Sequence, residues 1–205
     1  MFVAIEGIEG SGKSTLVAAL AERLRAEGLD VLTTREPGGT PAGDAIRSIF
    51  LRRDLPIAPL TESMLVSAAR AQHVEDVIRP ALAAGRIVLC DRFTDSTLAY
   101  QGHGRRLGRE VLRTLCEIAS EGVQPDFVLV LDVPLSVARA RLRARSGDTD
   151  RIEREDDAFH ERVRQGFLEL AAGPRHRVLD GTLAPEQLAA QAMDEFRSRR
   201  GDRAR

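Results

Sequence analysis

Lysine is almost absent from this chain of 205 residues, which contains a single lysine, Lys13, beside 29 arginines. Acidic and basic residues nearly balance, giving a net charge of −1 at pH 7, whereas a dedicated nucleic-acid-binding protein is usually strongly basic. No apolar run approaches the roughly 20 residues that span a bilayer, and the chain begins without the charged region and cleavage site of a secretory signal. We therefore expect a cytoplasmic protein with neither a membrane nor a nucleic acid as its partner.

Cysteine and histidine are also scarce. Cys90 lies in an apolar segment and Cys116 in a helical pattern, and the two do not form a C-x-x-C motif, so we expect two reduced, buried thiols. The four histidines are scattered without the spacing of metal ligands, which argues against a metal cluster built on them: His73, His103, His160 and His176.

The single lysine lies in the segment GIEGSGKS, residues 7–14, which matches G-x-x-x-x-G-K-[ST], the phosphate-binding P-loop. Such a loop uses a compact ammonium on a flexible stem, a role that a planar guanidinium does not fill. Residues 2–5 are typical of a buried strand and residues 15–27 of a helix, which is the setting that this motif requires. Backbone N–H groups and the helix N-terminus would bind nucleotide phosphates, and the hydroxyl of Ser14 would bind Mg²⁺. The predicted ATP-binding residues of this loop are Gly7, Ile8, Glu9, Gly10, Ser11, Gly12, Lys13, Ser14 and Thr15.

Short apolar segments alternate with helical patterns along the whole chain. The predicted strands are residues 2–5, 31–34, 87–90, 127–131 and 177–179, and helical stretches separate them. Strands that are apolar throughout and separated by helices indicate an α/β protein with a five-stranded parallel sheet covered on both faces. We expect one domain over residues 1–205, with a polar and frayed tail from Arg197 to Arg205.

Charged residues follow each predicted strand, where ligands bind in a parallel sheet. Glu6 follows the first strand, and Arg35 and Glu36 follow the second. Asp91 and Asp132 both satisfy the pattern of a strand-end carboxylate that holds Mg²⁺, and the sequence alone does not rank them. Asp180, after the last strand, is expected to be a solvated strand end.

Three further segments resemble the bacterial thymidylate kinase family over about residues 1–200. They are DRFTDSTLAYQG at residues 91–102, REPGGT at residues 35–40 and DRIE at residues 150–153, together with EGIEG in the P-loop. Adenylate, shikimate and dephospho-coenzyme A kinases share the P-loop but not the D-R-[FY]-x-x-S-x-x-A-Y segment. The resemblance implies a P-loop kinase fold, ATP and dTMP as substrates, Mg²⁺ with the ATP, dTDP as the product and a homodimer.

The resemblance also implies roles for individual residues. Arg92 would bind the acceptor phosphate, Asp91 would hold Mg²⁺ or its water, and Glu9 would lie near the sugar 3′-hydroxyl and the metal. The residues predicted to bind dTMP are Glu9, Pro37, Val66, Arg70, Arg92, Ser96, Thr97, Tyr100 and Gln101. Tyr100 is also consistent with an ordinary core tyrosine, and Pro37 with a simple turn proline.

An arginine-rich stretch over about residues 143–154 is predicted to form a short lid. Residues 8–11 of the P-loop contain no basic side chain, so positive charge for phosphoryl transfer must come from elsewhere, and similar thymidylate kinases supply it from the lid. Arg151 and Arg143 are our candidates, and Arg139 is expected to lie against adenine, although a solvated helix face would show the same charges. The predicted catalytic residues are Lys13, Arg92, Arg151, Asp91 and Glu9, with no general base, because a phosphate acceptor is already anionic at neutral pH.

One position departs from the family pattern. Where the family usually reads F-x-x-x-R, with the Phe on thymine and the Arg at its O4, this chain has Val66 and Arg70. A guanidinium donor at O4 still favours thymine or uracil over cytosine, whose amino group cannot accept a hydrogen bond. A kinase for another monophosphate, such as dUMP, is therefore one alternative. A catalytically inert nucleotide-binding regulator is another, but Ser14, Asp91 and Arg151, which inert relatives commonly lose, are all present.

Overall fold

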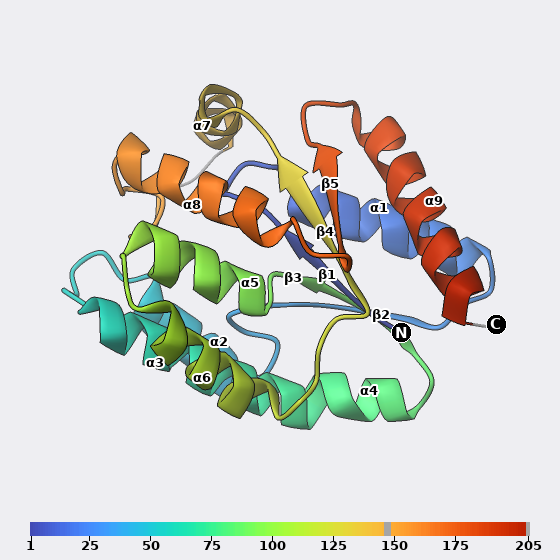
Figure 1. The fold of residues 1–205 in the computed structure, drawn as a ribbon, viewed down its shortest axis with the longest axis horizontal. Helices are drawn as coiled ribbons and strands as arrows, with labels where there is room; N and C mark the ends of the chain where they lie inside the picture. Colours follow the sequence, from blue (N-terminus) through green and yellow to red (C-terminus); the bar gives the residue numbers. More distant parts are fainter. Residues whose placement is uncertain (146–148, 204–205) are drawn as a thin grey trace.

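A five-stranded parallel sheet lies at the centre of the protein in a computed structural model, which describes residues 1–145 and 149–203 (Figure 1). The strand order is β2-β3-β1-β4-β5, and every neighbouring pair is parallel. The strands are β1 (Phe2–Glu6), β2 (Val31–Arg35), β3 (Ile87–Asp91), β4 (Phe127–Asp132) and β5 (His176–Asp180). The predicted α/β fold class is confirmed.

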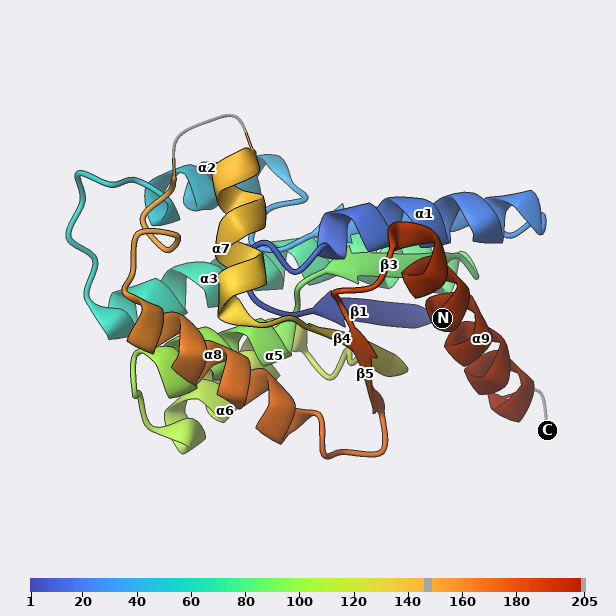
Figure 2. The ribbon, with the colours of Figure 1, turned by 90° about the horizontal axis from the view of Figure 1, so that it is seen from above.

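Helices cover both faces of the sheet (Figures 1 and 2). One face carries α1 (Lys13–Ala26) and α9 (Pro185–Arg203). The other side carries α2 (Pro41–Phe50), α3 (Pro59–His73), the π-helix η1 (Val74–Ile78), α4 (Arg79–Ala83), α5 (Thr94–Thr97), the π-helix η2 (Leu98–Gly104), α6 (Arg109–Ser120) and α8 (Asp157–Leu170). The remaining helix, α7 (Leu135–Ala144), follows β4 beyond its carboxyl end. None of the helices in the described part of the chain combines the length and apolarity needed to cross a bilayer.

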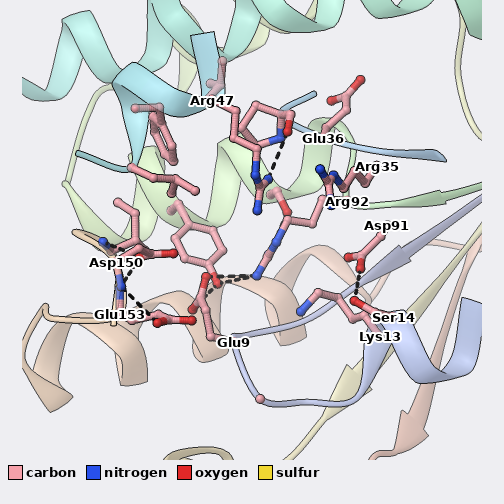
Figure 3. A pocket seen from close by; sticks show the side chains of 18 of the residues that line it. Glu9, Lys13, Ser14, Arg35, Glu36, Arg47, Asp91, Arg92, Asp150 and Glu153 are labelled. Carbon is pink, nitrogen blue, oxygen red and sulfur yellow. Dashed lines mark hydrogen bonds and ion pairs between the residues drawn. The ribbon is translucent and has the colours of Figure 1, made fainter. Parts of the chain in front are cut away.

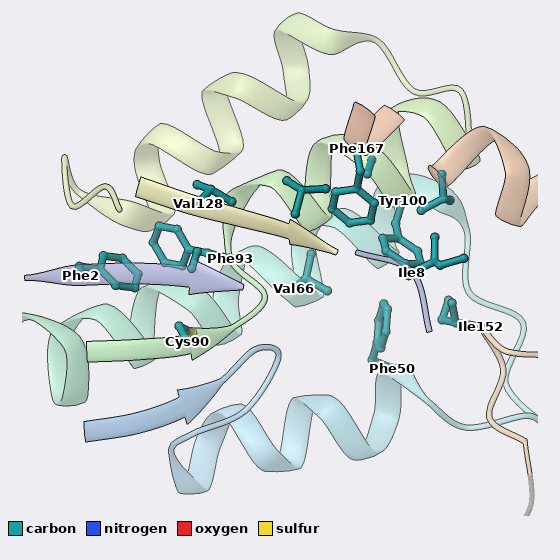
Figure 4. Packing of buried hydrophobic residues seen from close by; sticks show 14 of the residues in the cluster. Phe2, Ile8, Phe50, Val66, Cys90, Phe93, Tyr100, Val128, Ile152 and Phe167 are labelled. Carbon is teal, nitrogen blue, oxygen red and sulfur yellow. The ribbon is translucent and has the colours of Figure 1, made fainter. Parts of the chain in front are cut away.

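The alternation of side chains along β1 explains the two cores. Phe2 and Ala4 belong to the cluster beneath α2, α3 and α8, which Figure 4 shows, whereas Val3 and Ile5 pack beneath α1 and α9. All five residues of β1 are buried, as expected for a central strand with a covered face on each side. The edge strands β2 and β5 are more exposed, so the expectation of strands buried throughout holds for β1, β3 and β4.

Local capping fixes where two of the site-forming helices begin. Thr40 accepts a hydrogen bond from the backbone of Gly43 at 3.0 Å and precedes Pro41, whose fixed φ suits the first helical position, so α2 starts there. Asp156 accepts from the backbone of Phe159 at 2.6 Å and caps α8 in the same way.

The C-terminal segment differs from the sequence expectation. The predicted frayed tail is helical as far as Arg203, because α9 continues through it. Arg197 pairs with Glu27, directly after α1, at 2.5 Å, and Arg199 pairs with Glu195 one turn earlier at 2.8 Å. The last two residues of that tail and residues 146–148 of the predicted lid lie outside the described residues.

Candidate active site

A cavity of about 550 Å³ lies beyond the carboxyl ends of β1, β2 and β3 (Figure 3). The P-loop lies at one end of it, and α3 and η2 contribute the other end. Every residue that the sequence predicted to bind dTMP lines this cavity: Glu9, Pro37, Val66, Arg70, Arg92, Ser96, Thr97, Tyr100 and Gln101. The cavity therefore joins the predicted phosphate-binding loop to the predicted acceptor site in one continuous space.

The P-loop has the backbone that its glycines permit. Gly7 and Gly10 have φ angles of 140° and 75°, and a Cβ on them would lie 2.5 Å from the carbonyl oxygens of Leu131 and Ala138 respectively. Any larger residue would push the loop away from β4 and α7. Of the predicted loop residues, six face the cavity, namely Glu9, Gly10, Gly12, Lys13, Ser14 and Thr15. The other three loop residues do not line the cavity: Gly7, Ile8 and Ser11.

Lys13 is the first residue of α1 and lies folded over the loop. Its Nζ donates to the carbonyl of Ile8 at 2.8 Å and lies 3.4 Å from Ser11 Oγ, and the side chain is 6% exposed. Burial, followed by repulsion from Arg92, lowers the pKa of Lys13 to about 8. A buried ammonium whose hydrogen-bond partners are an uncharged carbonyl and a hydroxyl is well suited to bind anionic phosphate oxygens.

The structure distinguishes the two candidate metal-binding carboxylates. Asp91 Oδ2 accepts a hydrogen bond of 2.6 Å from Ser14 Oγ, and both residues line the cavity. Asp132 is instead bound by the guanidinium of Arg164 on α8, with N–O distances of 2.7 and 2.9 Å, and it does not line the cavity. Asp91 is therefore the carboxylate available to the site.

Arg92 is at the centre of the cavity and is held in an uncommon conformation. Its φ is 75°, in the left-handed region that costs an L-residue about 1–2 kcal/mol. The guanidinium donates to Gly7 O at 3.0 Å, to Glu9 Oε1 at 3.0 Å and to the Tyr100 hydroxyl at 3.1 Å. Figure 3 shows Arg92 and Glu9 facing each other in the cavity. Burial opposes the charge of Arg92, but attraction from Tyr100, Glu9 and Asp91 outweighs it and raises the pKa. This arginine is therefore positively charged and aimed into the cavity.

Glu9 is the counterion of Arg92. Its Oε2 accepts a 2.7 Å hydrogen bond from the Tyr100 hydroxyl. Burial alone would raise its pKa, but Arg92, Lys13 and the Tyr100 hydrogen bond together lower it, so Glu9 is ionised. The ring of Tyr100 lies under the Arg92 guanidinium at 4.9 Å.

Two arginines that the sequence analysis did not choose also line the cavity. Arg35 ends β2, and Arg47, on α2, donates to the carbonyl of Pro37 at 3.0 Å. Burial, then repulsion from Arg35 and Arg92, lowers the pKa of Arg47, which indicates that the three cations converge. Arg35 could have been found from its strand-end position, whereas nothing in the sequence distinguishes Arg47 from other helical arginines.

Arg70 lies at the end of the cavity away from the P-loop and is 2% exposed. Its Nε donates to Glu36 at 2.8 Å, and its Nη2 donates to the carbonyl of Phe93 at 2.9 Å and to Thr97 Oγ1 at 3.1 Å. Among the described residues, Nη1 donates only to the thiol of Cys116 at 3.6 Å, a weak acceptor, so Nη1 keeps a hydrogen for a ligand. The buried Glu36, which the sequence placed at a strand end but gave no role, thus orients the guanidinium.

The arginines around the predicted lid separate into two groups. Arg141 and Arg145 line the cavity; Arg141 Nη1 approaches the carbonyl of Ser11 at 3.3 Å, and Arg145 pairs with Glu153 at 2.6 Å. The three arginines that the sequence analysis chose, Arg139, Arg143 and Arg151, do not line it. Arg139 donates to the carbonyls of Glu153 and Glu155 at 2.7 and 2.8 Å, and Arg143 is exposed.

Arg151 lies outside the cavity and is mostly buried, with 13% of its side chain exposed. Its Nη1 pairs with the buried Glu62 at 2.7 Å, and its Nε donates to the carbonyl of Phe50 at 3.0 Å. The guanidinium also covers the Phe50 ring at 5.1 Å. In this structure Arg151 therefore joins the start of α3 to the end of α2 instead of facing the P-loop.

A family model for thymidylate kinase matches residues 5–192. The chain belongs to the thymidylate kinase family. Thymidylate kinase from Trichlorobacter lovleyi is 47% identical over 207 residues, covering 97% of this chain and 98% of that protein. Thymidylate kinase from Synechococcus sp. is 51% identical over 193 residues, covering 93% of this chain and 91% of that protein. The crystal structure of thymidylate kinase from Ehrlichia chaffeensis superposes with a TM-score of 0.77 at 30% identity, covering 96% of this chain and 98% of that one.

For a member of the thymidylate kinase family, the distribution of charge around the cavity is informative. The cations that line it are Lys13 of α1, Arg35 of β2, Arg47 of α2, Arg70 of α3 and Arg141 of α7, together with Arg92 directly after β3 and Arg145 directly after α7. Acidic side chains are fewer near the P-loop, and two of them, Glu9 and Asp91, are already bound to Arg92 and Ser14. Two anionic ligands can therefore meet in this space with their phosphates toward the same cations.

Proposed function

We propose that the protein transfers the γ-phosphoryl group of ATP to dTMP, giving dTDP for dTTP synthesis. The observation that carries this proposal is the single cavity that contains both the P-loop lysine and the whole predicted acceptor site. The two ends of this cavity have different roles in the proposal. Lys13 and Ser14 lie at the end that would bind the donor, and Arg70 and Gln101 lie at the end that would receive a base. Phosphoryl transfer of this kind needs positioning and charge stabilisation more than covalent chemistry.

The donor end would hold the phosphates of ATP. Backbone N–H groups of the P-loop and the N-terminus of α1 face the place that the β-phosphate would occupy. Lys13 would exchange its contact with the Ile8 carbonyl for phosphate oxygens. It would then stabilise the negative charge that develops on those oxygens during transfer. Arg141, whose Nη1 lies 3.3 Å from Ser11 O, borders the same loop and replaces Arg139 as our candidate for contact with the nucleotide.

Ser14 and Asp91 would hold Mg²⁺. A hydroxyl and a carboxylate 2.6 Å apart are hard oxygen donors, the type that Mg²⁺ takes beside substrate phosphates. No group of three or more His, Cys, Asp or Glu side chains within the described residues could hold a metal by itself, which fits a metal held partly by nucleotide. When bound, Mg²⁺ neutralises part of the phosphate charge; the two residues fix where that happens.

The acceptor phosphate of dTMP would lie between Arg92, Arg47 and Arg35. Arg92 is already charged and preset by its contacts with Gly7 and Glu9, so little side-chain freedom remains to be lost on binding. A phosphate monoester has a second pKa near 6 and is anionic at neutral pH, so its oxygen attacks without a general base. Glu9 and Tyr100 then lie beside the sugar, where a 2′-hydroxyl would approach the Tyr100 ring.

Thymine selectivity is assigned to Arg70 and its neighbours. The free hydrogen on Arg70 Nη1 would donate to O4 of thymine or uracil, whereas the 4-amino group of cytosine is a donor and leaves the guanidinium unpaired. Gln101 donates its amide hydrogen to Glu62 at 2.7 Å, which directs its carbonyl oxygen away from Glu62 and leaves it available to the imide N–H.

Val66 lines the base end of the cavity and belongs to the same core cluster as Phe50 and Tyr100 (Figure 4). We expect Val66→Phe to tighten dTMP binding by about threefold to tenfold, because an aromatic pair adds about 0.5–1.5 kcal/mol beyond area burial. Calorimetric titration of dTMP measures this, and ATP affinity is the internal control. Weaker dTMP binding in the variant would mean that Phe50 already occupies the stacking position and that the new ring overpacks the site.

The affinity for ATP should depend on pH through Lys13. Because its pKa is lowered to about 8 in the free protein, the ammonium fraction falls as pH rises through 8, and ATP binding weakens by up to tenfold per pH unit above it. Bound phosphates restore the charge, so binding takes up a proton between pH 8 and 9. Calorimetry in two buffers of different ionisation enthalpy detects that proton uptake, and Lys13→Ala should abolish it. An ATP affinity that stays constant from pH 7 to 9.5 would contradict this role of Lys13.

We also propose a homodimer. Leu60 and Met64 on α3 and Val111 and Ile118 on α6 are 44%, 52%, 51% and 68% exposed, and the two helices pack side by side (Figure 1). Large apolar side chains gathered on neighbouring helices are typical of an interaction face. Sedimentation equilibrium tests this, and a monomeric mass at micromolar concentration would contradict it.

The cytoplasmic location inferred from the sequence remains a prediction.

One coupled assay tests the proposed activity. Purified protein is given ATP and Mg²⁺ with dTMP, dUMP, dCMP, UMP or AMP in turn, and ADP formation is followed. We expect dTMP to give the highest kcat/KM, with dUMP second because it shares O4 and the imide N–H but lacks the methyl group. Turnover of AMP or UMP above that of dTMP would reject the proposal, and no turnover of any acceptor would support an inert nucleotide-binding protein.

A further inference from the structure

Glu6 is a buried carboxyl group that the mechanism above does not use. It is the last residue of β1, its side chain is 0% exposed, and it does not line the 550 Å³ cavity. It therefore cannot touch either substrate from its present position. An acidic side chain enclosed in this way needs hydrogen-bond partners that compensate for lost hydration, and those partners reveal its role.

All of these partners belong to the segment that follows Arg92. Glu6 Oε1 accepts from the backbone N–H of Phe93 at 2.7 Å and from that of Ser96 at 3.2 Å. Its Oε2 lies 2.6 Å from Ser96 Oγ, and that same Oγ accepts from Nη1 of Arg92 at 3.1 Å. Glu6 thus reaches Arg92 by two routes, through the backbone immediately after it and through the hydroxyl that touches its guanidinium.

The conformation of Arg92 explains why such support is needed. Arg92 has a φ of 75°, which an arginine does not adopt unless its surroundings enforce it. The backbone N–H of Arg92 donates to the carbonyl of Ile5 at 2.9 Å, and the next N–H donates to Glu6. Two consecutive residues of β1 therefore hold the turn on both sides and direct the Arg92 side chain into the cavity.

We infer that Glu6 is a positioning residue that presets Arg92 to bind the acceptor phosphate. This inference rests on the proposed function, since it assigns Arg92 to the phosphate of dTMP. Loss of Glu6 would leave two buried N–H groups unpaired and allow the turn to relax, so the guanidinium would have to be ordered by the ligand at the time of binding. Within the described residues Glu6 makes its hydrogen bonds to the segment after Arg92 and acts on Lys13 only as a nearby charge, so the donor site should be affected much less.

The hydrogen-bonding geometry, rather than the negative charge, carries this role. Burial, then repulsion from Asp95, raises the pKa of Glu6 to about 8, so the neutral form prevails at pH 7. The short contact between Oε2 and Ser96 Oγ accommodates a proton on either oxygen. Glutamine has the shape of the neutral form, with an oxygen for the two N–H groups and a donor for Ser96.

Three variants of Glu6 test the inference in steady-state kinetics. Glu6→Gln should keep KM for dTMP within about twofold of the wild type. Glu6→Asp, which is too short to reach Phe93 and Ser96, and Glu6→Ala should raise KM for dTMP at least tenfold while KM for ATP stays within twofold. Thermal unfolding of each variant shows whether it is folded. If Glu6→Ala does not fold, Glu6→Asp is the variant that is compared with Glu6→Gln.

A double-mutant cycle with Arg92→Ala separates positioning from general support of the fold. If Glu6 acts through Arg92, Glu6→Asp causes no further rise in KM for dTMP when Arg92 is already absent. Equal effects on both substrates, an additive effect in the Arg92→Ala background, or a tenfold loss in Glu6→Gln would each overturn the inference. Failure of the wild-type protein to phosphorylate dTMP would be seen first and would count against the proposed function instead.

Discussion

Lys13→Ala should lower kcat by about 100-fold to 1,000-fold, the usual consequence of removing one preorganised group that stabilises transition-state charge. The loss is expected to be this large because no other basic side chain of the P-loop can substitute, and arginines elsewhere approach from different elements. Initial rates with saturating ATP and dTMP measure the effect.

The fold should tolerate this substitution. Lys13 is 6% exposed and its ammonium contacts one carbonyl and one hydroxyl, so its removal leaves no buried charge unpaired. The thermal unfolding temperature should stay within a few degrees of the wild type, which serves as the control. A variant that turns over dTMP at the wild-type rate would show that Lys13 has no part in transfer.

Arg145→Ala should lower kcat by at least about 100-fold with little change in either KM. Its guanidinium lines the cavity directly after α7 and is held by Glu153 at 2.6 Å. We expect it to move onto the phosphate undergoing transfer, the position in which an arginine contributes a thousandfold or more in related chemistry. An interaction formed only in the transition state lowers kcat and kcat/KM together.

Two neighbours provide matched controls for Arg145. Arg143→Ala removes the same charge two residues earlier, at an exposed position in α7 outside the cavity, and we expect kcat within twofold of the wild type. Arg151→Ala breaks the contacts with Glu62 and Phe50 and should affect stability more than kcat. If Arg151→Ala has the large kcat effect and Arg145→Ala does not, Arg151 must leave Glu62 during the reaction and our assignment is wrong.

The P-loop and the strands were predictable because their signals are local. A glycine pattern requires particular φ angles, and an apolar segment of four or five residues between helices must be buried in a sheet. The segment from Asp91 to Gln101 was informative for the same reason, since a strand end and about two turns of helix bring its side chains together regardless of the remaining fold.

The arginines of α7 could not be chosen from sequence, and helix geometry explains why. They occur at every second position from Arg139 to Arg145, so one pair, Arg139 and Arg143, is four residues apart, and so is the other, Arg141 and Arg145. Each pair shares a helix face. Only the rotation of α7 about its axis decides which face meets the cavity, and that rotation depends on packing against α8.

The two strand-end aspartates were undecided for a different reason. β3 and β4 both flank β1, so Asp91 and Asp132 are equally close to the P-loop in the order of strands. The difference arises from Arg164 on α8, which neutralises Asp132, and a partner 32 residues away is not visible in a local pattern. The helical continuation of α9 beyond Arg197 was also not visible in a local pattern, because the ion pair of Arg197 with Glu27 spans 170 residues.

The scarcity of lysine gives this protein an unusual spectroscopic and chemical property. Growth on lysine labelled with ¹⁵N at the side-chain nitrogen would introduce one signal, from Nζ of Lys13, in the middle of the P-loop. Apart from the chain terminus, amine-directed reagents would find the same atom, with a pKa near 8 and a side chain only 6% exposed. The signal of this single nitrogen therefore reports whether the donor site is occupied, without any engineered label. A nucleotide bound over Lys13 should also protect its side chain from acylation.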